Sequence, residues 1–138
     1  HLMGRIILSK TIKSKAEWKK ILSDDAFEIT RNQGTEPAFS GKYDQCFEDG
    51  VYICVCCNKE LFDSKSKFNS GCGWPSYSNS IEESSLSESQ DNSYDMIRTE
   101  VKCSGCDAHL GHVFNDGPSP GGLRYCINSV AITFKKRL

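Results

Sequence analysis

Two C-x-x-C pairs, widely separated along the chain, constrain its fold more than any other feature of the sequence. They are Cys54 with Cys57 and Cys103 with Cys106. In such a turn both sulfurs face one side, where they can bind a tetrahedral ion at about 2.3 Å. Four thiolates leave no open ligand position, which is typical of a structural zinc site that joins distant segments. We therefore predict one structural zinc ion per chain, bound by these four cysteines.

The cysteine turns also leave some choices open. A single pair would fit buried thiols or a redox C-x-x-C as well as a metal, but two pairs favour the metal. Cys56 could pair with Cys54 or Cys57 instead. Because neighbouring side chains alternate in direction along an extended chain, Cys54 with Cys57 has the better geometry, and we expect Cys56 to pack as a spare thiol. Gly105 is expected to take the positive φ of a tight turn.

Charge and composition exclude several classes of protein. Lys and Arg total 17 against 18 Asp and Glu, a net charge of −1, so the basic surplus of a nucleic-acid-binding protein is missing. The sequence has neither a long apolar stretch nor a signal-peptide pattern, and its free thiols favour the reducing cytoplasm. We expect a monomer with one domain over residues 5–138. His1–Met3 reads as a remnant of an expression vector.

The N-terminal part is predicted to form two short packing helices. Ser14 and Glu17 make a capping-box pattern at the start of the first helix. An apolar stripe at helical spacing follows it, formed by Trp18, Ile21 and Leu22. Residues 23–29 are expected to form the second helix, capped by the Ser-Asp-Asp run at its start. The Pro and Gly content of residues 34–41 predicts a loop.

From about residue 51 the pattern changes to the period of two that is typical of strands. Val51–Cys54 reads as a strand that runs into the first cysteine turn. Residues 94–102 alternate with Ile97, Thr99 and Val101 on the dry face. Residues 123–134 alternate as well and end in the apolar set Val130, Ile132 and Phe134. Residues 80–93, rich in serine and acids, are predicted to be a mobile surface loop or a frayed helix.

Cys126 lies in an alternating segment that would put three functional side chains on one face. On a strand, Arg124, Cys126 and Asn128 point the same way. A guanidinium beside a thiol favours the nucleophilic thiolate, and an amide offers hydrogen bonds to a substrate or water. The alternative is a small core thiol. It would bury Arg124 and Asn128 at a cost, so the pattern favours function.

Three further features are open from the residues alone. Cys72 has a glycine on each side, which gives the backbone freedom of a resolving thiol but fits an inert thiol in a turn equally well. Trp74 suits the core or the apolar wall of a ligand pocket. His109 and His112 could donate protons, bind a second metal or be structural.

Taken together, these segments resemble the type B methionine-R-sulfoxide reductase family. The resemblance covers about residues 15–134 in the family's order and spacing. Its motifs are Thr35–Pro37, Ser70–Ser76, Cys103–Phe114, Asp116–Pro118 and Arg124–Ser129. Two departures are Tyr77, where phenylalanine is common, and the extra thiol of Cys56. The combination of motifs is far more specific than any one of them.

The resemblance implies a mainly β fold with two antiparallel sheets, short peripheral N-terminal helices and a zinc knuckle pair opposite the active site. It implies that Cys126 is the catalytic nucleophile and Cys72 the resolving cysteine. The active-site histidines and the residues that support the thiolate would be His109, His112, Arg124 and Asn128. The substrate-binding residues would be Trp74, Phe114 and Asp116.

The implied reaction reduces the R epimer of methionine sulfoxide, mainly in oxidised proteins or peptides, without an organic cofactor. A Cys126 sulfenic acid and then a Cys72–Cys126 disulfide would form, and a thioredoxin-like dithiol would reduce the disulfide. A zinc-stapled binding module is the main rival, but it would not require Cys72, Arg124 and Cys126 together. A nucleic-acid-binding zinc ribbon is disfavoured by the charge and by the long spacer between the cysteine pairs.

Overall fold

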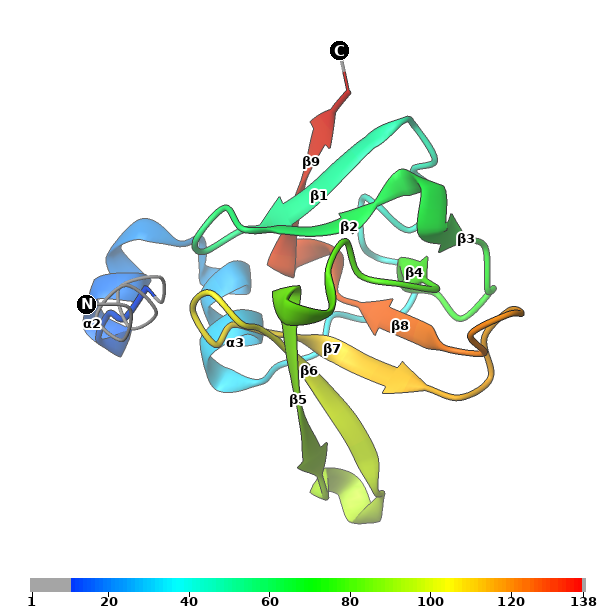
Figure 1. The fold of residues 1–138 in the computed structure, drawn as a ribbon. Helices are drawn as coiled ribbons and strands as arrows, with labels where there is room; N and C mark the ends of the chain where they lie inside the picture. Colours follow the sequence, from blue (N-terminus) through cyan, green and yellow to red (C-terminus); the bar gives the residue numbers. More distant parts are fainter. Residues whose placement is uncertain (1–10, 138) are drawn as a thin grey trace, which may run out of the picture.

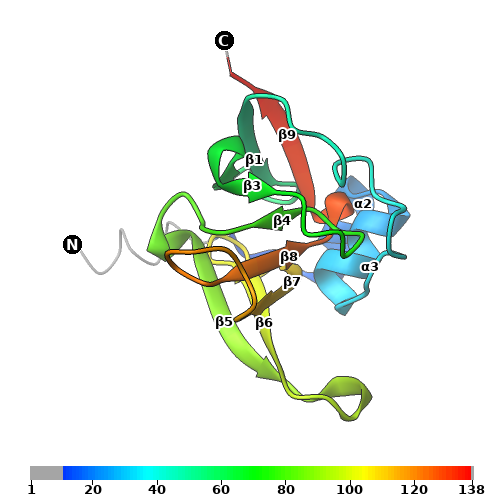
Figure 2. The same cartoon turned by 90° about the vertical axis from the view of Figure 1, so that its right-hand side faces the viewer.

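Two antiparallel β-sheets that share one core form the body of the molecule (Figures 1 and 2). The structure, a computed structural model, describes residues 11–137. The smaller sheet has the strand order β2-β1-β9, and the larger has the order β3-β4-β8-β7-β6-β5. The strands are β1 (Gly50–Cys54), β2 (Glu60–Asp63), β3 (Lys67–Phe68), β4 (Ser76–Tyr77), β5 (Leu86–Asp91), β6 (Arg98–Cys103), β7 (His109–Phe114), β8 (Arg124–Ile127) and β9 (Ile132–Lys136). The predicted fold class, mainly β with two antiparallel sheets, is confirmed.

Two short helices lie at the periphery, as predicted: α2 (Lys15–Ile21) and α3 (Asp24–Asn32). The capping box of α2 is present, because Ser14 Oγ accepts from the Glu17 backbone N–H at 3.2 Å and the Glu17 carboxylate accepts from the Ser14 N–H at 2.8 Å. Ser23 caps α3, because its Oγ accepts from the backbone N–H of Ala26 at 3.2 Å. Local hydrogen bonding at each N-terminus therefore explains where the helices begin.

The apolar stripe predicted for the first helix is only partly right. Trp18 is 1% exposed, whereas Ile21 is 61% exposed at the end of α2. Trp18 packs under the guanidinium of Arg31 from α3, 4.7 Å from the ring centroid. The indole ring is thus the buried centre of the contact between the helices, with polar contacts such as that of Lys15 Nζ with Asn32 Oδ1 at 2.8 Å around it.

The segment 80–93, predicted as a loop or a frayed helix, contains strand β5, so that prediction is wrong. β5 pairs with β6 over its whole length, from Leu86 opposite Cys103 to Asp91 opposite Arg98. It is the edge strand of the larger sheet, and most of its side chains are exposed. An edge strand is held by backbone pairing on one side, so it needs few β-branched or aromatic residues.

The alternation predicted for residues 94–102 is only partly right, because Val101 is fully buried as expected but two other side chains are not placed as expected. Ile97 is 81% exposed, and Glu100 is 3% exposed. Glu100 is buried because α3 ends over this face of the sheet, where Gln33 Nε2 donates to the Glu100 carboxylate at 2.8 Å. A buried carboxylate is tolerated when it accepts such hydrogen bonds.

Residues 123–134 form two strands rather than one alternating run. β8 belongs to the larger sheet and β9 to the smaller one. A 3-10 turn at Ser129–Ala131 separates them, with Asn128 at its N-terminal end. The chain therefore crosses from one sheet to the other directly after Cys126 and Asn128.

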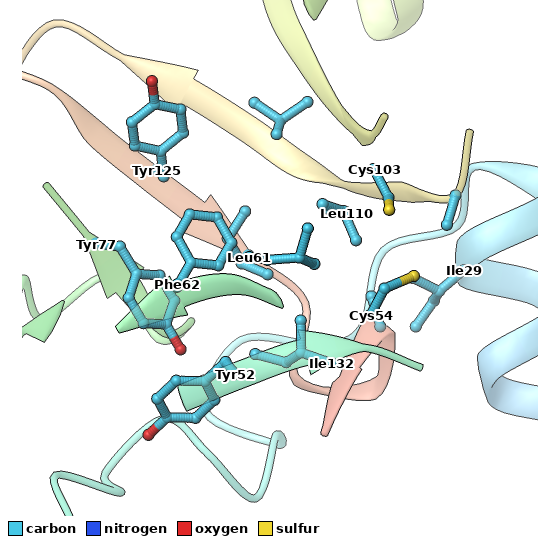
Figure 3. Close-up of a cluster of buried hydrophobic side chains, with 14 of the residues drawn as sticks. Ile29, Tyr52, Cys54, Leu61, Phe62, Tyr77, Cys103, Leu110, Tyr125 and Ile132 are labelled. Carbon is cyan, nitrogen blue, oxygen red and sulfur yellow. The ribbon is translucent and has the colours of Figure 1, made fainter. Parts of the chain in front are cut away.

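The hydrophobic core lies between the two sheets (Figure 3). Phe62 from the smaller sheet stacks on Tyr77 from the larger one, with ring centroids 4.3 Å apart. Tyr52 packs edge-on against Tyr77 at 5.4 Å. Cys54 and Cys103 are fully buried at one end of this core. Aromatic contacts thus join the sheets in the middle, and cysteines join them at one end.

One face of the larger sheet collects the polar side chains. Directly paired residues share a face, and the cross-strand pairs here are Asp91 with Arg98, Glu100 with His112, and His112 with Cys126. A register shift between Val101 and Lys102, where Lys102 pairs with His109, adds a bulge. Residues three apart on a regular strand face opposite ways, so the bulge lets His109 join His112 on this face.

Among residues 11–137, no helix is long and apolar enough to cross a membrane. The predicted vector remnant at residues 1–3 and the predicted start of the domain at residue 5 lie outside the described residues.

Candidate active site and metal centre

The four predicted metal ligands lie together in a cluster that could bind a metal ion. Their sulfur atoms are all within 4.8 Å of one another. Cys54 Sγ lies 3.6 Å from Cys106 Sγ, and Cys57 Sγ lies 3.6 Å from Cys103 Sγ. A tetrahedral zinc ion with bonds of about 2.3 Å needs sulfur atoms about 3.8 Å apart. The donor set therefore fits a closed tetrahedral thiolate site.

The same turn is built twice around this cluster. The backbone N–H of the first cysteine of each pair donates to the carbonyl five residues further along the chain. Cys54 N–H donates to the Lys59 carbonyl, and Cys103 N–H donates to the Ala108 carbonyl. Left-handed residues close the turns, Asn58 with φ 65° and Asp107 with φ 62°. The prediction that Gly105 takes a positive φ is therefore wrong, because Asp107 takes it in this turn.

Gly105 matters for space and for its amide instead. Its backbone N–H donates to Cys103 Sγ at 3.3 Å. A Cβ at this position would lie 3.0 Å from Cys57 Sγ, a tight contact that would require this metal-ligand candidate to shift by a few tenths of an ångström. Glycine thus lets the backbone approach the sulfur atoms, as in many metal-binding turns.

Two neighbours lie beside the four-cysteine cluster. Arg31 donates to the Cys106 carbonyl at 2.9 Å and lies 3.8 Å from its Sγ, so a cation faces the thiolate cluster. Cys56 is half-buried, with Sγ 3.5 Å from Thr30 Oγ1, and it is not part of the four-cysteine group. This agrees with its predicted role as a packed spare thiol.

Cys126 and Cys72 meet on the polar face of the larger sheet. Their sulfur atoms are 3.7 Å apart. Cys126 comes from β8, opposite Ser76 of β4, and Cys72 comes from the loop between β3 and β4. In Figure 1 this loop lies at the opposite end of the molecule from the two cysteine turns. Two thiols at this separation need only a small movement to form a disulfide, whose sulfur atoms are about 2.05 Å apart.

The loop that carries Cys72 has two glycines with positive φ and is held by side-chain contacts to the sulfur. Gly71 and Gly73 both have positive φ, 77° and 98°. Ser70 Oγ lies 3.0 Å from Cys72 Sγ and Ser76 Oγ lies 3.4 Å from it. A Cβ on Gly73 would clash with Ala38 Cβ at 2.7 Å, so this glycine is required by packing as well as by its backbone.

The two thiols have opposite tendencies to ionise. Burial raises the pKa of Cys126 to about 12, and the neighbouring Cys72 adds to the rise against the opposing effect of Arg124. Burial also opposes ionisation of Cys72, but hydrogen bonds from Ser70 and Ser76 outweigh it and lower the pKa of Cys72. Arg124 lowers the pKa of Cys126, in the expected direction, but burial and the adjacent thiol outweigh this effect in this conformation.

The pair opens into a cavity of about 200 Å³. Seven of the predicted site residues line it: Cys72, Trp74, His112, Phe114, Arg124, Cys126 and Asn128. The wall is mixed, with an indole and a phenyl ring beside a guanidinium, an imidazole and the two thiols. The cavity can therefore hold a small group that has both an apolar and a polar part.

Asn128 works through the backbone around it. Its Nδ2 donates to the Leu110 carbonyl at 3.0 Å, and its Oδ1 accepts from the Glu36 N–H at 3.0 Å. The Glu36 carbonyl in turn accepts from Trp74 Nε1 at 3.0 Å. Asn128 thus connects the strand beside Cys126 to the loop that holds the indole ring.

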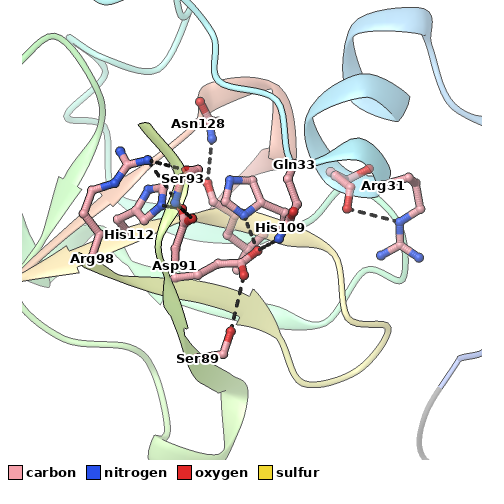
Figure 4. A network of polar contacts seen from close by, with 12 residues as sticks. Arg31, Gln33, Ser89, Asp91, Ser93, Arg98, His109, His112 and Asn128 are labelled. Atoms are coloured by element: carbon pink, nitrogen blue, oxygen red, sulfur yellow. Dashed lines mark hydrogen bonds and ion pairs between the residues drawn. The ribbon is translucent and has the colours of Figure 1, made fainter. Parts of the chain in front are cut away.

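Both histidines are paired with carboxylates (Figure 4). His109 Nδ1 lies 2.7 Å from Glu100, and His112 Nε2 lies 2.7 Å from Asp91. Their rings meet edge-on, with centroids 5.5 Å apart. His109 does not line the cavity with Cys126, so it lies behind His112, whereas His112 faces the thiol pair directly.

The His109–Glu100 pair is a buried one. Burial lowers the pKa of His109 in spite of the neighbouring carboxylate. Burial opposes ionisation of Glu100 too, but hydrogen bonds from Gln33 and His109 lower its pKa. The pair therefore holds an ionised glutamate and a neutral histidine that donates from Nδ1, and His109 Nε2 is buried without a hydrogen-bond partner.

Asp116 acts at a distance from the cavity. Its side chain is 65% exposed, and it accepts from Arg124 Nε at 2.8 Å and from Nη2 at 3.2 Å. Phe114 lies under the same guanidinium, 4.4 Å from its ring centroid. The carboxylate and the ring together fix the direction of Arg124 toward the thiols.

Three cavity or support residues were not singled out from the sequence. Arg98 lines the cavity, and Asp91 holds His112. Thr35 also lines the cavity, and in the sequence it is named only as part of the motif Thr35–Pro37. Asp91 lies within residues 80–93, the segment predicted to be a loop or a frayed helix, and the predicted alternation puts Arg98 on the wet face of a strand. The pairing of β5 with β6 brings them to the site, and the local pattern does not reveal that pairing.

Comparison with known proteins gives a consistent family. The SelR domain family matches residues 22–136. A relative from Herminiimonas arsenicoxydans, called peptide methionine sulfoxide reductase MsrB, is 56% identical over 125 residues, which are 91% of this chain and 91% of the relative. Relatives of the same name from Pseudomonas putida strain GB-1 and Pseudomonas entomophila strain L48 are 54% and 55% identical over 94% of this chain and 99% of their own length. The chain therefore belongs to the SelR domain family, together with the peptide methionine sulfoxide reductases of the MsrB type.

Proposed function

We propose that this protein reduces the R epimer of methionine sulfoxide, mainly in oxidised proteins and peptides, to methionine. One observation carries the proposal: two cysteine sulfurs lie 3.7 Å apart at a cavity with an aromatic wall and cationic and imidazole groups. The names of the relatives supply the substrate class. Cys126 serves as the nucleophile and Cys72 as the resolving thiol.

In the first step Cys126 attacks the sulfoxide sulfur as a thiolate, which is the minor form in this conformation because burial raises its pKa to about 12. The oxygen passes to Cys126, the methionine sulfide leaves, and one proton is taken up, which leaves Cys126 as a sulfenic acid. His112, which lines the cavity, serves as the proton source for the oxygen, and His109 supports it through the edge-on contact of the two rings. Arg124 and Asn128 support the charge and the hydrogen bonds around the thiolate. Cys126 is oxidised by two electrons and the substrate sulfur is reduced by two.

The remaining cavity residues hold the substrate. Trp74 and Phe114 offer an apolar wall for the sulfoxide methyl group. Arg124, held by Asp116, favours the negative end of the S–O dipole and the thiolate. A methyl group on one side and an oxygen on the other give the two epimers different contacts, which supports selection of one of them.

In the second step Cys72 attacks Cys126 Sγ. An S–S bond forms, the S–O bond breaks, and water leaves. A thioredoxin-like dithiol then reduces the disulfide and restores both thiols. The positive φ of Gly71 and Gly73 supports a loop that can present this disulfide to a partner.

The four-cysteine cluster is proposed to bind one zinc ion. Cys54, Cys57, Cys103 and Cys106 would hold it, and the ion would supply structural cross-linking rather than chemistry. All eight cysteines are free thiols, which suits the reducing cytoplasm. We also propose that residues 5–138 act as one catalytic unit and as a monomer.

Epimer selectivity tests the proposal directly. The purified protein, incubated with dithiothreitol and either pure epimer of N-acetylmethionine sulfoxide, should convert the R epimer and leave the S epimer unreduced. Methionine formation is measured by chromatography. No turnover of R, or equal turnover of both epimers, would defeat the proposal.

Replacing Cys72 with serine should separate recycling from chemistry. We expect thioredoxin-supported turnover to be lost, while turnover with dithiothreitol persists, because the small dithiol can reduce the sulfenic acid itself. Cys72 also contributes to the raised pKa of Cys126. The pH profile of Cys126 alkylation should therefore move to lower pH in Cys72→Ser. Unimpaired cycling with thioredoxin would show that another thiol resolves the intermediate.

A further inference from the structure

Asp91 is in direct contact with the histidine that faces the cavity. Its Oδ2 lies 2.7 Å from His112 Nε2 (Figure 4). Asp91 is the last residue of β5, so the edge strand brings this carboxylate to the same sheet face as His112 and Cys126. His112 is opposite Cys126 in the β7–β8 ladder. The Asp91 side chain therefore reaches over β6 to His112 on β7, which in turn lies beside the reactive thiol on β8.

The Asp91 carboxylate is an acceptor at neutral pH. The hydrogen bond from His112 holds its pKa well below the usual range, and hydrogen bonds from Ser93 add to the effect. An ionised carboxylate has no proton to donate. His112 Nε2 must therefore carry the hydrogen of this contact, in the neutral as well as in the charged ring.

The carboxylate is itself fixed on two sides. The Ser93 N–H donates to Asp91 Oδ1 at 2.9 Å. Arg98 Nη2 lies 3.4 Å from Asp91 Oδ2 and 3.2 Å from Ser93 Oγ. Because Arg98 also lines the cavity, one guanidinium braces Asp91 from the substrate side.

The other ring nitrogen of His112 has no such partner. Among residues 11–137, no hydrogen bond reaches His112 Nδ1, and this atom is not among the buried polar atoms that lack a partner. His112 lines the reactive cavity. Nδ1 is thus the nitrogen open to a substrate or to water there.

We propose that Asp91 is a positioning residue that fixes the ring and tautomer of His112, so that the proton His112 exchanges in the reaction is carried on Nδ1 at the cavity. This inference rests on the proposed reductase function. Without the carboxylate, the neutral ring can place its hydrogen on either nitrogen and can rotate away from the thiol. Arg98 keeps Asp91 in the orientation that this role needs.

Asp91→Asn is the informative variant, because it keeps the size of the side chain, removes the negative charge and replaces one of the two acceptor oxygens with an N–H donor. The rate of Cys126 sulfenic acid formation from N-acetylmethionine-R-sulfoxide, measured in a single turnover, should fall about tenfold to a hundredfold. Asp95→Asn is the matched control. It makes the same change on the exposed turn of the same hairpin, at a left-handed residue that asparagine suits, and it should stay within about twofold of the wild type.

A double-mutant cycle separates this role from a merely structural one. If Asp91 acts only through His112, Asp91→Asn should cause no further loss in a His112→Gln background. Long-range 15N–1H spectra of the imidazole ring supply a readout that does not depend on activity. The wild-type protein near neutral pH should show His112 with hydrogen on Nε2, and Asp91→Asn should change that tautomer pattern, whereas Asp95→Asn should not.

The outcomes are distinct. An unchanged single-turnover rate in Asp91→Asn, a full additional loss in the His112→Gln background, or a wild-type His112 with hydrogen on Nδ1 and none on Nε2 would each overturn the inference. If the wild-type protein fails to reduce the R epimer, the proposed function fails. The ring spectra would still report whether Asp91 holds His112.

Discussion

Replacing Cys126 with serine is expected to abolish sulfoxide reduction with either thioredoxin or dithiothreitol, lowering kcat/KM by roughly four orders of magnitude or more. A serine hydroxyl is a far weaker nucleophile and cannot form a sulfenic acid. The measurement is initial-rate turnover of N-acetylmethionine-R-sulfoxide with each reductant. The loss should be the same for both reductants, because the first step itself is removed.

Cys46→Ser is the matched control for this variant. Cys46 is a half-buried free thiol outside the reactive cavity, so its replacement should leave turnover near the wild-type value. Cys126→Ser activity within tenfold of the wild type would show that another group attacks the sulfoxide. The assignment of Cys126 as nucleophile would then have to be given up.

Loss of the metal centre should have the largest effect on stability. Cys54 ends a strand of the smaller sheet and Cys103 ends a strand of the larger one, so the cluster joins the two sheets. Apparent binding energies for structural zinc are about 10–16 kcal/mol, similar to or larger than the total stability of a small protein, about 5–15 kcal/mol. We expect Cys103→Ser to lose the metal and to be unfolded, or to have its Tm lowered by more than 10 °C.

The check combines metal analysis with thermal unfolding followed by circular dichroism. Cys56→Ser is the control, because Cys56 lies beside the centre without belonging to the four-cysteine group. It should keep one zinc ion per chain and a Tm close to that of the wild type. A Cys103→Ser protein with a full zinc content and an unchanged Tm would contradict a structural role for the cluster.

The features best predicted from the sequence are those set by short-range chemistry. The two cysteine turns and the capping box at Ser14 are complete within a few residues, so their spacing alone indicates them. The meeting of Cys72 with Cys126 is a long-range contact. Only the resemblance to a family implied it, since the glycines around Cys72 fit an inert turn equally well.

The wrong predictions share a physical cause. At these positions burial and pairing depend on tertiary contacts and not on the hydrophobicity of the local sequence. Glu100 is buried because His109 and Gln33 satisfy its carboxylate, and no periodic pattern of apolar residues reveals that. β5 is held by pairing with β6 rather than by an apolar face. The turn after Asn128 interrupts a run that still alternates in sequence, so the crossing from one sheet to the other is not visible there.

The hydrogen bonds that run from Asn128 through the Glu36 peptide to the Trp74 indole have a consequence for selectivity. The indole lines the cavity together with the thiol pair, and its position is tied to Asn128 through the main chain of residue 36. A shorter side chain at position 128 would release this loop and let the indole retreat. Redesign of the pocket for sulfoxides bulkier than a methyl group would therefore begin at residue 128 as much as at residue 74.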